Sequence, residues 1–356
     1  MPLIKFLLFP FAFLYGLVTD YRNHLYDIGK KPGFKFDRFI ISVGNLTAGG
    51  TGKTPFVEML VRALCNHFEL AVLSRGYRRK TTGYRLAGSD DNALTIGDEP
   101  FQYFLKYGNV LKVAVGEERI LAIPELLSAH ESVEVIILDD AYQHRKVQRD
   151  YNVLLCDYHR PFYNDKVIPA GLLREKPRHA NRADVVVVTK CPDGMESKEM
   201  QDIQTQIIKY TKSETPIYFS GIRYLEPKGV YGEKTISASV FLFTGIASHE
   251  PLEKYTATKY NLIGSRHFPD HHHFSRRDMD LLLEDFNKCP GADRCLLTTE
   301  KDMVRLLSLD DARLKELPIF YLPIELYFIE KGDFFTSGLI ERINNSKSTL
   351  GQEEVS

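Results

Sequence analysis

The sequence lacks several features that mark specialised protein classes. Its 356 residues carry 46 Lys and Arg against 47 Asp and Glu, a formal net charge of -1, which excludes a globally basic nucleic-acid-binding protein. The 5 cysteines form no Cys-x-x-Cys pair and are odd in number, which argues against a disulfide framework or a zinc site and for a reducing compartment. What remains is a composition close to the globular average, in a chain long enough for about two domains.

The amino terminus departs from this average. Within the first eighteen residues the only charged side chain is Lys5. The apolar run is shorter than the roughly 20 residues of a spanning helix, is interrupted by Pro10 and Gly16, and precedes no small-residue cleavage site. The tyrosines and basic residues that follow favour a membrane–water interface. We therefore expect a monotopic membrane-associated helix over residues 1–30, with a buried first helix and a signal or spanning segment as alternatives.

Short runs of aliphatic and β-branched residues recur along the chain and predict buried strands. These runs lie at residues 39–43, 70–73, 133–138, 153–156, 184–188 and 295–299. Helical stretches separate them, which indicates an α/β fold: a mostly parallel sheet with helices on both faces. The composition changes near residue 222, before a second α/β pattern. We expect a core at residues 31–222 and a smaller C-terminal α/β subdomain at residues 223–356.

A glycine-rich segment joins the first predicted strand to a helical stretch, as in P-loop nucleotide-binding proteins. Glycines let backbone N–H groups wrap phosphate oxygens, a lysine brings positive charge to the β- and γ-phosphates, and a hydroxyl reaches Mg²⁺. The strict pattern requires glycine where this chain has Thr47, so the segment is a GGxGKT variant. The expected phosphate-binding residues are Gly49, Gly50, Thr51, Gly52, Lys53 and Thr54.

Acidic residues elsewhere in the sequence complete a candidate site for phosphoryl transfer. Asp139 and Asp140 follow the predicted strand at residues 133–138, where P-loop proteins hold Mg²⁺ with a carboxylate. Asp98 is a candidate base, and His271 could tune or relay its proton. Phosphoryl transfer depends mainly on positioning and charge neutralisation, so this small set of residues suffices.

Three kinds of P-loop protein compete at this point. A GTPase requires an N/T-K-x-D element after a strand, and the segment from Thr189 to Asp193 has one residue too many. A membrane-associated ATPase switch of the partitioning type carries a signature lysine where this chain has Ala48. A small-molecule or lipid kinase needs an acidic residue at the acceptor hydroxyl, for which Asp98 is the candidate.

Eight motifs bear on this choice. In order they are GNLTAGGTGKTP from Gly44, SRGYRRK from Ser74, GDEP from Gly97, LDDAYQHRK from Leu138, IPAGLLREKP from Ile168, RADVVVVTK from Arg182, FPDHHHF from Phe268 and TTEKD from Thr298. Together they resemble the tetraacyldisaccharide 4'-kinase family of lipid A synthesis in Gram-negative bacteria. The resemblance implies transfer of the ATP γ-phosphoryl group, with Mg²⁺, to the 4'-hydroxyl of an acylated glucosamine disaccharide 1-phosphate, giving lipid IVA.

The resemblance also implies roles for individual residues. It makes Asp98 the base or the hydroxyl-orienting residue and assigns Mg²⁺ to the acidic pair. Tyr77 and Arg119 resemble acceptor-binding positions, and Gln143 is a further substrate-binding candidate. Family members have glycine where this chain has Ala141, a change that could alter the freedom of the backbone.

The expected partners follow from an acylated, phosphorylated acceptor. The basic run at residues 74–80 is a candidate contact for the acceptor phosphate or for anionic headgroups. The acyl chains of such a substrate require a membrane surface, which gives the apolar amino terminus a purpose. We expect peripheral or monotopic association with the cytoplasmic face of the bacterial inner membrane, no nucleic-acid partner and no obligate protein partner.

Overall fold

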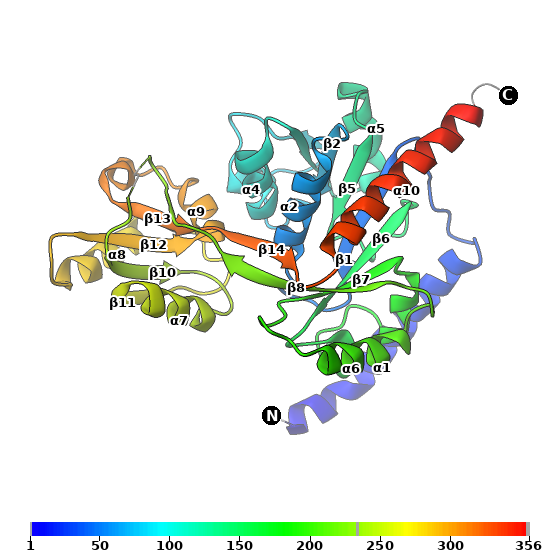
Figure 1. The fold of residues 1–356 in the computed structure, drawn as a ribbon, viewed down its shortest axis with the longest axis horizontal. Coiled ribbons are helices and arrows are strands. Elements are labelled where there is room, and N and C mark those ends of the chain that lie inside the picture. The colour runs from blue at the N-terminus through cyan, green and yellow to red at the C-terminus, as the bar shows by residue number, and fades with distance from the viewer. Residues whose placement is uncertain (1, 233–234, 354–356) are drawn as a thin grey trace.

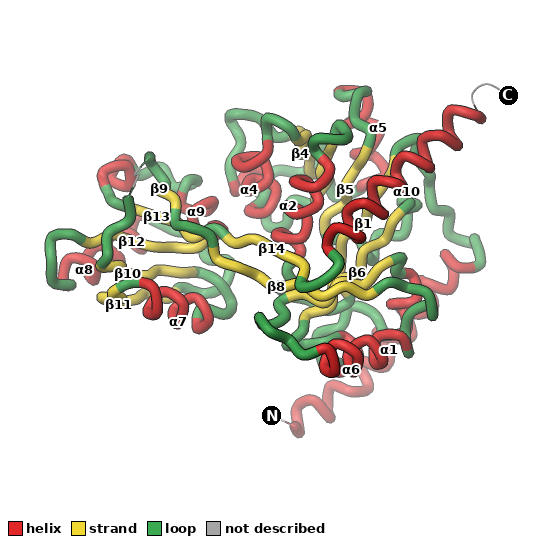
Figure 2. The backbone as a smooth tube through the Cα atoms, viewed as in Figure 1, coloured by secondary structure: helices red, strands yellow, loops and turns green. Residues whose placement is uncertain are grey.

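Two sheets organise the chain, which a computed structural model describes over residues 2–232 and 235–353 (Figures 1 and 2). The larger sheet has nine strands in the order β14-β8-β7-β6-β1-β5-β2-β4-β3. Its central strands pair in parallel, and only β3 with β4 and β14 with β8 pair antiparallel. The strands are β1 (Phe39–Asn45), β2 (Leu70–Ser74), β3 (Arg85–Leu86), β4 (Leu111–Val115), β5 (Val135–Asp139), β6 (Tyr151–Asp157), β7 (Val185–Thr189), β8 (Ile217–Tyr224) and β14 (Ile324–Phe328).

Helices cover both faces of the larger sheet. Ile41 and Val43 of β1 pack in one core with Phe56 of α2, whereas Ile40 faces the opposite core with Ile123 of α5. Strands buried on both faces read as continuous apolar runs, which explains why the sequence reveals them. The helical elements of this lobe are α1 (Pro2–Asp27), α2 (Lys53–Leu64), α3 (Ala93–Ile96), α4 (Asp98–Tyr107), α5 (Arg119–Ala129), η1 (Phe162–Asn164), η2 (Pro177–Arg182), α6 (Ser197–Ile208) and α10 (Gly332–Glu353).

The smaller lobe has a five-stranded sheet in the order β11-β10-β12-β13-β9. All its pairings are parallel except that of β9 with β13. Its strands are β9 (Lys228–Gly229), β10 (Ser239–Thr244), β11 (Asn261–His267), β12 (Arg294–Thr299) and β13 (Ile319–Leu322). Its helices are α7 (Glu250–Lys259), α8 (Arg276–Lys288), α9 (Glu300–Leu306) and η3 (Ala312–Glu316).

The chain leaves the larger lobe through β8 and returns through β14, and these two paired strands connect the lobes (Figure 1). After its return, α10 buries Phe335 and Leu339 in the core beside α2. The unit expected at residues 223–356 thus includes β14 and α10, which pack with the larger sheet. We propose that the smaller lobe comprises only residues 225–322 and that the rest of the C-terminal segment belongs to the core.

Helix α1 is continuous from Pro2 to Asp27, with Pro10 and Gly16 inside it, so these two residues do not interrupt the helix. Several apolar side chains on it are exposed, among them Phe11 at 63% and Val18 at 67%. Among the residues that the structure describes, no helix is long and apolar enough to cross a membrane.

Candidate active site

The glycine-rich loop leaves the carboxyl end of β1 and ends where α2 begins. Gly49 and Gly52 have φ angles of 118° and 79°, a left-handed region that glycine adopts without a Cβ clash. Helix α2 starts at Lys53, directly after Gly52, so its free N–H groups adjoin the loop. This is the arrangement that binds phosphate groups in P-loop proteins.

The end of β7 holds the glycine-rich loop from a second side. Thr189 Oγ1 donates a hydrogen bond to the carbonyl oxygen of Thr51 at 2.9 Å. Lys190 Nζ donates to the carbonyl oxygen of Gly50. The segment from Thr189 to Asp193, whose spacing does not fit a GTPase element, therefore holds the glycine-rich loop through its first two residues.

Lys53 and Arg174 converge on Asp140. The Lys53 Nζ atom lies 3.6 Å from Asp140 Oδ1, and Arg174 Nη1 donates to the same oxygen at 2.7 Å. Gln143 lies against Arg174 and donates from Nε2 to the carbonyl oxygen of Asn45 at 2.9 Å. Burial alone would raise the pKa of Asp140, but the charges of Lys53 and Arg174 lower it. Asp140 is therefore ionised, and two cations are gathered beside the loop.

Asp139 is a buried carboxylate with one open oxygen. Its side chain accepts a hydrogen bond from the Tyr103 hydroxyl at 3.4 Å through Oδ2, while Oδ1 is buried and has no hydrogen-bond partner among the described residues. Burial, aided by the charge of Asp140, raises the pKa of Asp139 to about 6. Thr54 lies nearby in the first turn of α2 and is 8% exposed. A buried carboxylate with an unused oxygen fits a cation, directly or through water.

Backbone geometry explains two details of the motifs that form this site. A Cβ at Gly44 would lie 2.7 Å from the backbone nitrogen of Tyr142, so only glycine fits at the end of β1. The left-handed residue of the acidic loop is Asp140, with a φ angle of 49°, and not Ala141. The alanine that replaces the family's glycine therefore occupies an unstrained position.

Arg119 lies next to Asp139 and Asp140 and is buried, at 3% exposure. Its Nη1 donates to the carbonyl oxygen of Gly116 at 2.9 Å and its Nη2 to that of Asp139 at 3.2 Å. Burial lowers the pKa of the guanidinium to about 10, so it is still charged at neutral pH. In this arrangement Arg119 holds the backbone of Asp139, and its exposure is too small for a broad acceptor contact.

Asp98 and His271 meet across the two lobes through a third residue, Arg305. Arg305 Nε donates to Asp98 Oδ2 at 2.7 Å, and its Nη2 lies 3.2 Å from His271 Nδ1. The His271 Nδ1 atom is itself 3.6 Å from Asp98 Oδ2. Burial opposes ionisation of Asp98, but the hydrogen bond of His271 and the charge of Arg305 outweigh it and lower the pKa to about 2. The expected pair is thus brought together, with a buried arginine between its members.

Tyr77 lies on the exposed side of the cluster formed by Asp98, His271 and Arg305. Its ring is 59% exposed and meets the His271 ring edge-on, with centroids 6.0 Å apart. The turn before it lies close to the start of α4, because a Cβ at Gly97, whose φ is 97°, would lie 3.2 Å from Gly76 Cα. Gly76 and Gly97 therefore let the two backbone segments approach closely, which brings Tyr77 near Asp98.

The basic run from Arg75 to Lys80 is divided in the structure. Arg79 pairs with Glu117 at 2.6 Å and its side chain is only 2% exposed. Arg75, Arg78 and Lys80 are exposed beside Tyr77. Three of the four basic residues are therefore exposed where an anionic group could reach them, with Arg78 lying over the Tyr77 ring.

Sequence reasoning missed three residues with central contacts: Asn45, Arg174 and Arg305. Asn45 and Arg174 lie inside quoted motifs, but nothing local connects Asn45 to Gln143 or Arg174 to Asp140. Arg305 lies three residues beyond the TTEKD motif and pairs with a residue 207 positions away. One signal was present, since an arginine at this spacing from Asp302 lies on the same face of a helix.

A parallel sheet with a glycine-rich loop after a central strand, a lysine at the following helix and an acidic pair on the neighbouring strand defines a P-loop nucleotide-binding protein. More narrowly, the chain belongs to the family described as tetraacyldisaccharide-1-P 4'-kinase, which matches residues 4–344. The family membership expected from the motifs and the α/β fold expected from the alternating strand and helix patterns are both confirmed.

Individual relatives agree with this assignment. The chain is 42% identical to a tetraacyldisaccharide 4'-kinase of Flavobacterium johnsoniae, over 97% of this chain and 99% of that protein. It is 39% identical to one of Bacteroides thetaiotaomicron, over 98% and 96% of the two chains. Among solved structures, LpxK from Aquifex aeolicus in complex with ATP is similar, with 27% identity, a TM-score of 0.75 and coverage of 96% and 99%.

Proposed function

We propose that this protein is an ATP-dependent kinase that phosphorylates the 4'-hydroxyl of a tetraacylated glucosamine disaccharide 1-phosphate to give lipid IVA. The observation that carries the proposal is the pairing of two sites in a member of this family. The first site is the P-loop with Lys53 and Asp140, which fits a nucleotide. The second site is Asp98 with His271. Asp98 is the first residue of α4, and Tyr103 of the same helix contacts Asp139, so α4 connects the two sites. The alternative, an ATPase switch of the partitioning type, would have no use for the second site.

The nucleotide side follows from charge. Lys53, Arg174 and the N–H groups at the start of α2 supply positive potential for the β- and γ-phosphates of ATP. We propose that Thr54, Asp139 and Asp140 hold Mg²⁺, because the open Oδ1 of Asp139 is a buried acceptor that a cation would satisfy. Bound Mg²⁺ would neutralise the charge that develops on the phosphate oxygens. The residues Gly49 to Gly52 would wrap the phosphates from the other side.

The acceptor side depends on Asp98. A carboxylate with a pKa of about 2 is a weak proton acceptor at neutral pH. We therefore assign Asp98 the task of orienting the 4'-hydroxyl by accepting its hydrogen bond, with proton transfer following late in the reaction, when the attacking oxygen has become acidic. A loose phosphoryl-transfer transition state makes small demands on early deprotonation. Tyr77 and the exposed Arg75 and Arg78 would contact the sugar or its phosphate.

The lipid side involves helix α1. Its exposed apolar residues, which include Phe9, Phe11, Leu14 and Val18, would enter the headgroup and acyl boundary of a bilayer. The substrate's acyl chains lie in such a bilayer, so an enzyme attached to the same surface meets its acceptor there. We propose association with the cytoplasmic face of the inner membrane.

The test is a phosphoryl-transfer assay with γ-labelled ATP, Mg²⁺ and a tetraacylated disaccharide 1-phosphate in mixed micelles. We expect one new labelled lipid, formed by the wild-type protein and not by the Lys53→Ala variant. An ATPase switch would instead release labelled inorganic phosphate with no labelled lipid, and that result would overturn the proposal.

A further inference from the structure

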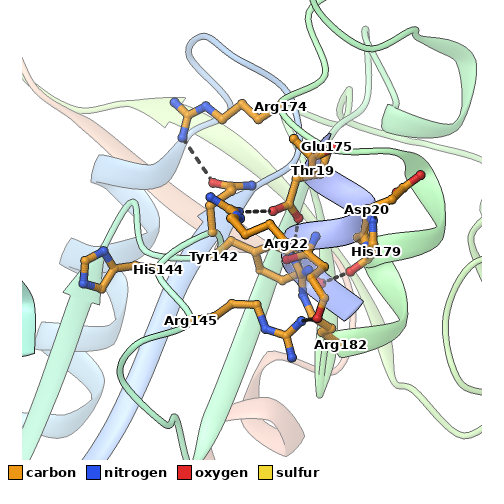
Figure 3. A network of polar contacts seen from close by, with 12 residues as sticks. Thr19, Asp20, Arg22, Tyr142, His144, Arg145, Arg174, Glu175, His179 and Arg182 are labelled. Carbon is orange, nitrogen blue, oxygen red and sulfur yellow. Dashed lines mark hydrogen bonds and ion pairs between the residues drawn. The ribbon is translucent and has the colours of Figure 1, made fainter. Parts of the chain in front are cut away.

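Helix α1 has a polar face that is tied to the core (Figure 3). Asp20 accepts hydrogen bonds from Lys176 at 2.6 Å, and its carboxylate also lies 2.8 Å from both Arg178 and His179. The Lys176 side chain runs directly over Gly16 of α1, since a Cβ at Gly16 would lie 2.8 Å from Lys176 Cε. The apolar face of α1 is exposed, while its polar face forms hydrogen bonds and ion pairs with residues 174–182.

A fully buried carboxylate forms the centre of this interface. Glu175 is 0% exposed and pairs with Arg22 of α1 at 2.7 Å and with Arg182 of η2 (Figure 3). Arg182 in turn lies over the ring of Tyr142, 4.8 Å from its centroid. A buried carboxylate that loses one of its partners is strongly destabilised, so Glu175 depends on Arg22 to keep its position.

The residue next to Glu175 belongs to the nucleotide site. Arg174 reaches Asp140, and its backbone N–H donates to the carbonyl oxygen of Leu46 at 2.7 Å, at the entrance to the glycine-rich loop. Its own carbonyl oxygen accepts a hydrogen bond from the Tyr15 hydroxyl of α1 at 3.2 Å. The backbone at this point is thus clamped between the P-loop on one side and α1 on the other.

We propose that Glu175 and Arg22 are positioning residues that couple the docking of α1 to the nucleotide site by holding Arg174 on Asp140. Arg174 and Lys53 share one carboxylate oxygen. If Arg174 loses its contact with Asp140, the Asp140 carboxylate pairs with Lys53 alone. The positive charge that Lys53 and Arg174 offer to the ATP phosphates then falls. The affinity for MgATP therefore depends on α1, and this dependence is separate from any contact that α1 makes with lipid. The inference rests on the proposed function for the identity of the nucleotide.

The experiment measures equilibrium binding of a fluorescent ATP analogue with Mg²⁺ to the full chain in detergent, with no acceptor present. We expect Arg22→Gln and Glu175→Gln to weaken binding at least tenfold and Arg22→Lys to restore most of it. Arg178→Gln is the matched control, because Arg178 pairs with Asp20 in the same interface but is 63% exposed. It should stay within twofold of the wild type.

Steady-state kinetics then separate positioning from general damage. In Arg22→Gln the KM for ATP should rise with the binding constant, while the KM for a micellar acceptor stays within threefold. Unchanged nucleotide affinity in folded Arg22→Gln, or equal loss in Arg22→Lys, would overturn the inference. Because nucleotide binding is read without an acceptor, failure of the kinase assay alone would refute the proposed function and not this coupling.

A separate cluster in the smaller lobe has the composition of a metal site. His249 precedes α7, Glu253 follows one turn later, and His267 ends β11; one ligand atom from each lies within 4.8 Å of the others. His267 Nε2 and Glu253 Oε2 are 3.4 Å apart. Two ligands of a tetrahedral ion with bonds of about 2.0–2.1 Å are separated by about 3.4 Å.

The contact of the other ring nitrogen of His267 is compatible with a metal site, because the Thr244 hydroxyl can accept a hydrogen bond from it. Thr244 Oγ1 lies 3.1 Å from His267 Nδ1. In the tautomer with its proton on Nδ1, His267 donates to Thr244 and Nε2 presents a lone pair to the Glu253 carboxylate, and a cation between these two acceptors would satisfy both. We infer that His249, Glu253 and His267 bind a borderline divalent ion such as Zn²⁺, with the His249 ring turning from its stacked position on His267, 3.7 Å between centroids, to bring a nitrogen to the ion.

Such an ion would brace the two loops that carry His271. The backbone N–H of Phe268 donates to the carbonyl oxygen of Thr244 at 2.7 Å, and that of His271 donates to the carbonyl oxygen of Gly245 at 3.2 Å. Arg305 also donates to the Gly245 carbonyl oxygen, at 2.8 Å. An ion held by the residues flanking these bonds would restrict the motion of His271 relative to Asp98.

Calorimetric titration of the untagged full chain with ZnCl₂, in excess Mg²⁺, tests this site. We expect one zinc ion per chain with a micromolar or tighter dissociation constant. His249→Ala, Glu253→Gln and His267→Ala should each weaken binding at least thirtyfold, whereas the exposed His67→Ala should match the wild type. Absence of stoichiometric zinc binding, or binding that the three variants leave unchanged, would mean that His267 and Glu253 form only an ion pair.

Discussion

The contact between Arg305 and Asp98 allows a quantitative prediction. Arg305 has a fully buried side chain and Asp98 is 9% exposed, so solvent screens their 2.7 Å contact little. The pKa of Asp98 falls from an ordinary 3.8 to about 2. At about 1.4 kcal/mol for each tenfold change in proton affinity, the ionised Asp98 is stabilised by about 2 kcal/mol, shared between Arg305 and His271.

The sign of the pH dependence follows from the lowered pKa. The folded-state pKa lies below the unfolded one, so this stabilisation is complete above about pH 4 and is lost as the pH falls towards 2. A double-mutant cycle of Arg305→Gln and Asp98→Asn, measured by urea unfolding at pH 7.5, should give a coupling energy of about 1–2 kcal/mol. Arg305→Gln alone should cost about 3–5 kcal/mol, because it also leaves Asp302 unpaired.

A matched control separates this buried pair from an ordinary ion pair. Arg313 and Asp280 are also 2.7 Å apart, but their side chains are 49% and 60% exposed. The corresponding cycle of Arg313→Gln and Asp280→Asn should give less than about 1 kcal/mol. If the Arg305–Asp98 coupling is below about 0.5 kcal/mol, or equals that of the exposed pair, the account of how Asp98 is held is wrong.

Two variants and one pH titration test the site and the membrane surface. Asp98→Asn should lower kcat at least about 100-fold and leave the KM for ATP within threefold, because Asp98 acts on the acceptor hydroxyl; a normal kcat would remove it from the reaction. The Mg²⁺ concentration for half-maximal activity should rise as the pH falls below about 6, since protons then compete for Asp139, and a constant requirement between pH 8 and pH 5.5 would contradict its role as a metal ligand. Phe11→Asp combined with Val18→Asp should abolish co-flotation with anionic vesicles while keeping nucleotide binding; continued flotation would mean that another surface makes the attachment.

Local pattern was sufficient for the strands and for the nucleotide loop. The strand at residues 39–43, the glycines and Lys53 are contiguous in the chain, so their spacing alone specifies a strand, a loop and a helix. The acidic pair was equally accessible, because a carboxylate after a buried strand lies at the ligand-binding edge of a parallel sheet.

The remaining features depend on contacts between distant segments. Arg174 meets Asp140 across 34 residues and Arg305 meets Asp98 across 207, and neither pairing leaves a periodic signal. The return of the chain through β14 was missed for the same reason, since a short strand at Ile324–Phe328 carries no mark of which sheet it joins. Helix α1 continues through Pro10 although its sequence suggested a break there.

The most direct measurement of the central claim uses two acceptors that differ at one position. The first is the tetraacylated disaccharide 1-phosphate and the second is its 4'-deoxy analogue, each incubated with γ-labelled ATP and Mg²⁺. We predict that the first gains one labelled phosphate on the distal sugar and that the second gains none while still competing with the first for the enzyme. Labelling of the 4'-deoxy analogue, or of neither acceptor, would contradict the assignment of this chain as a 4'-kinase.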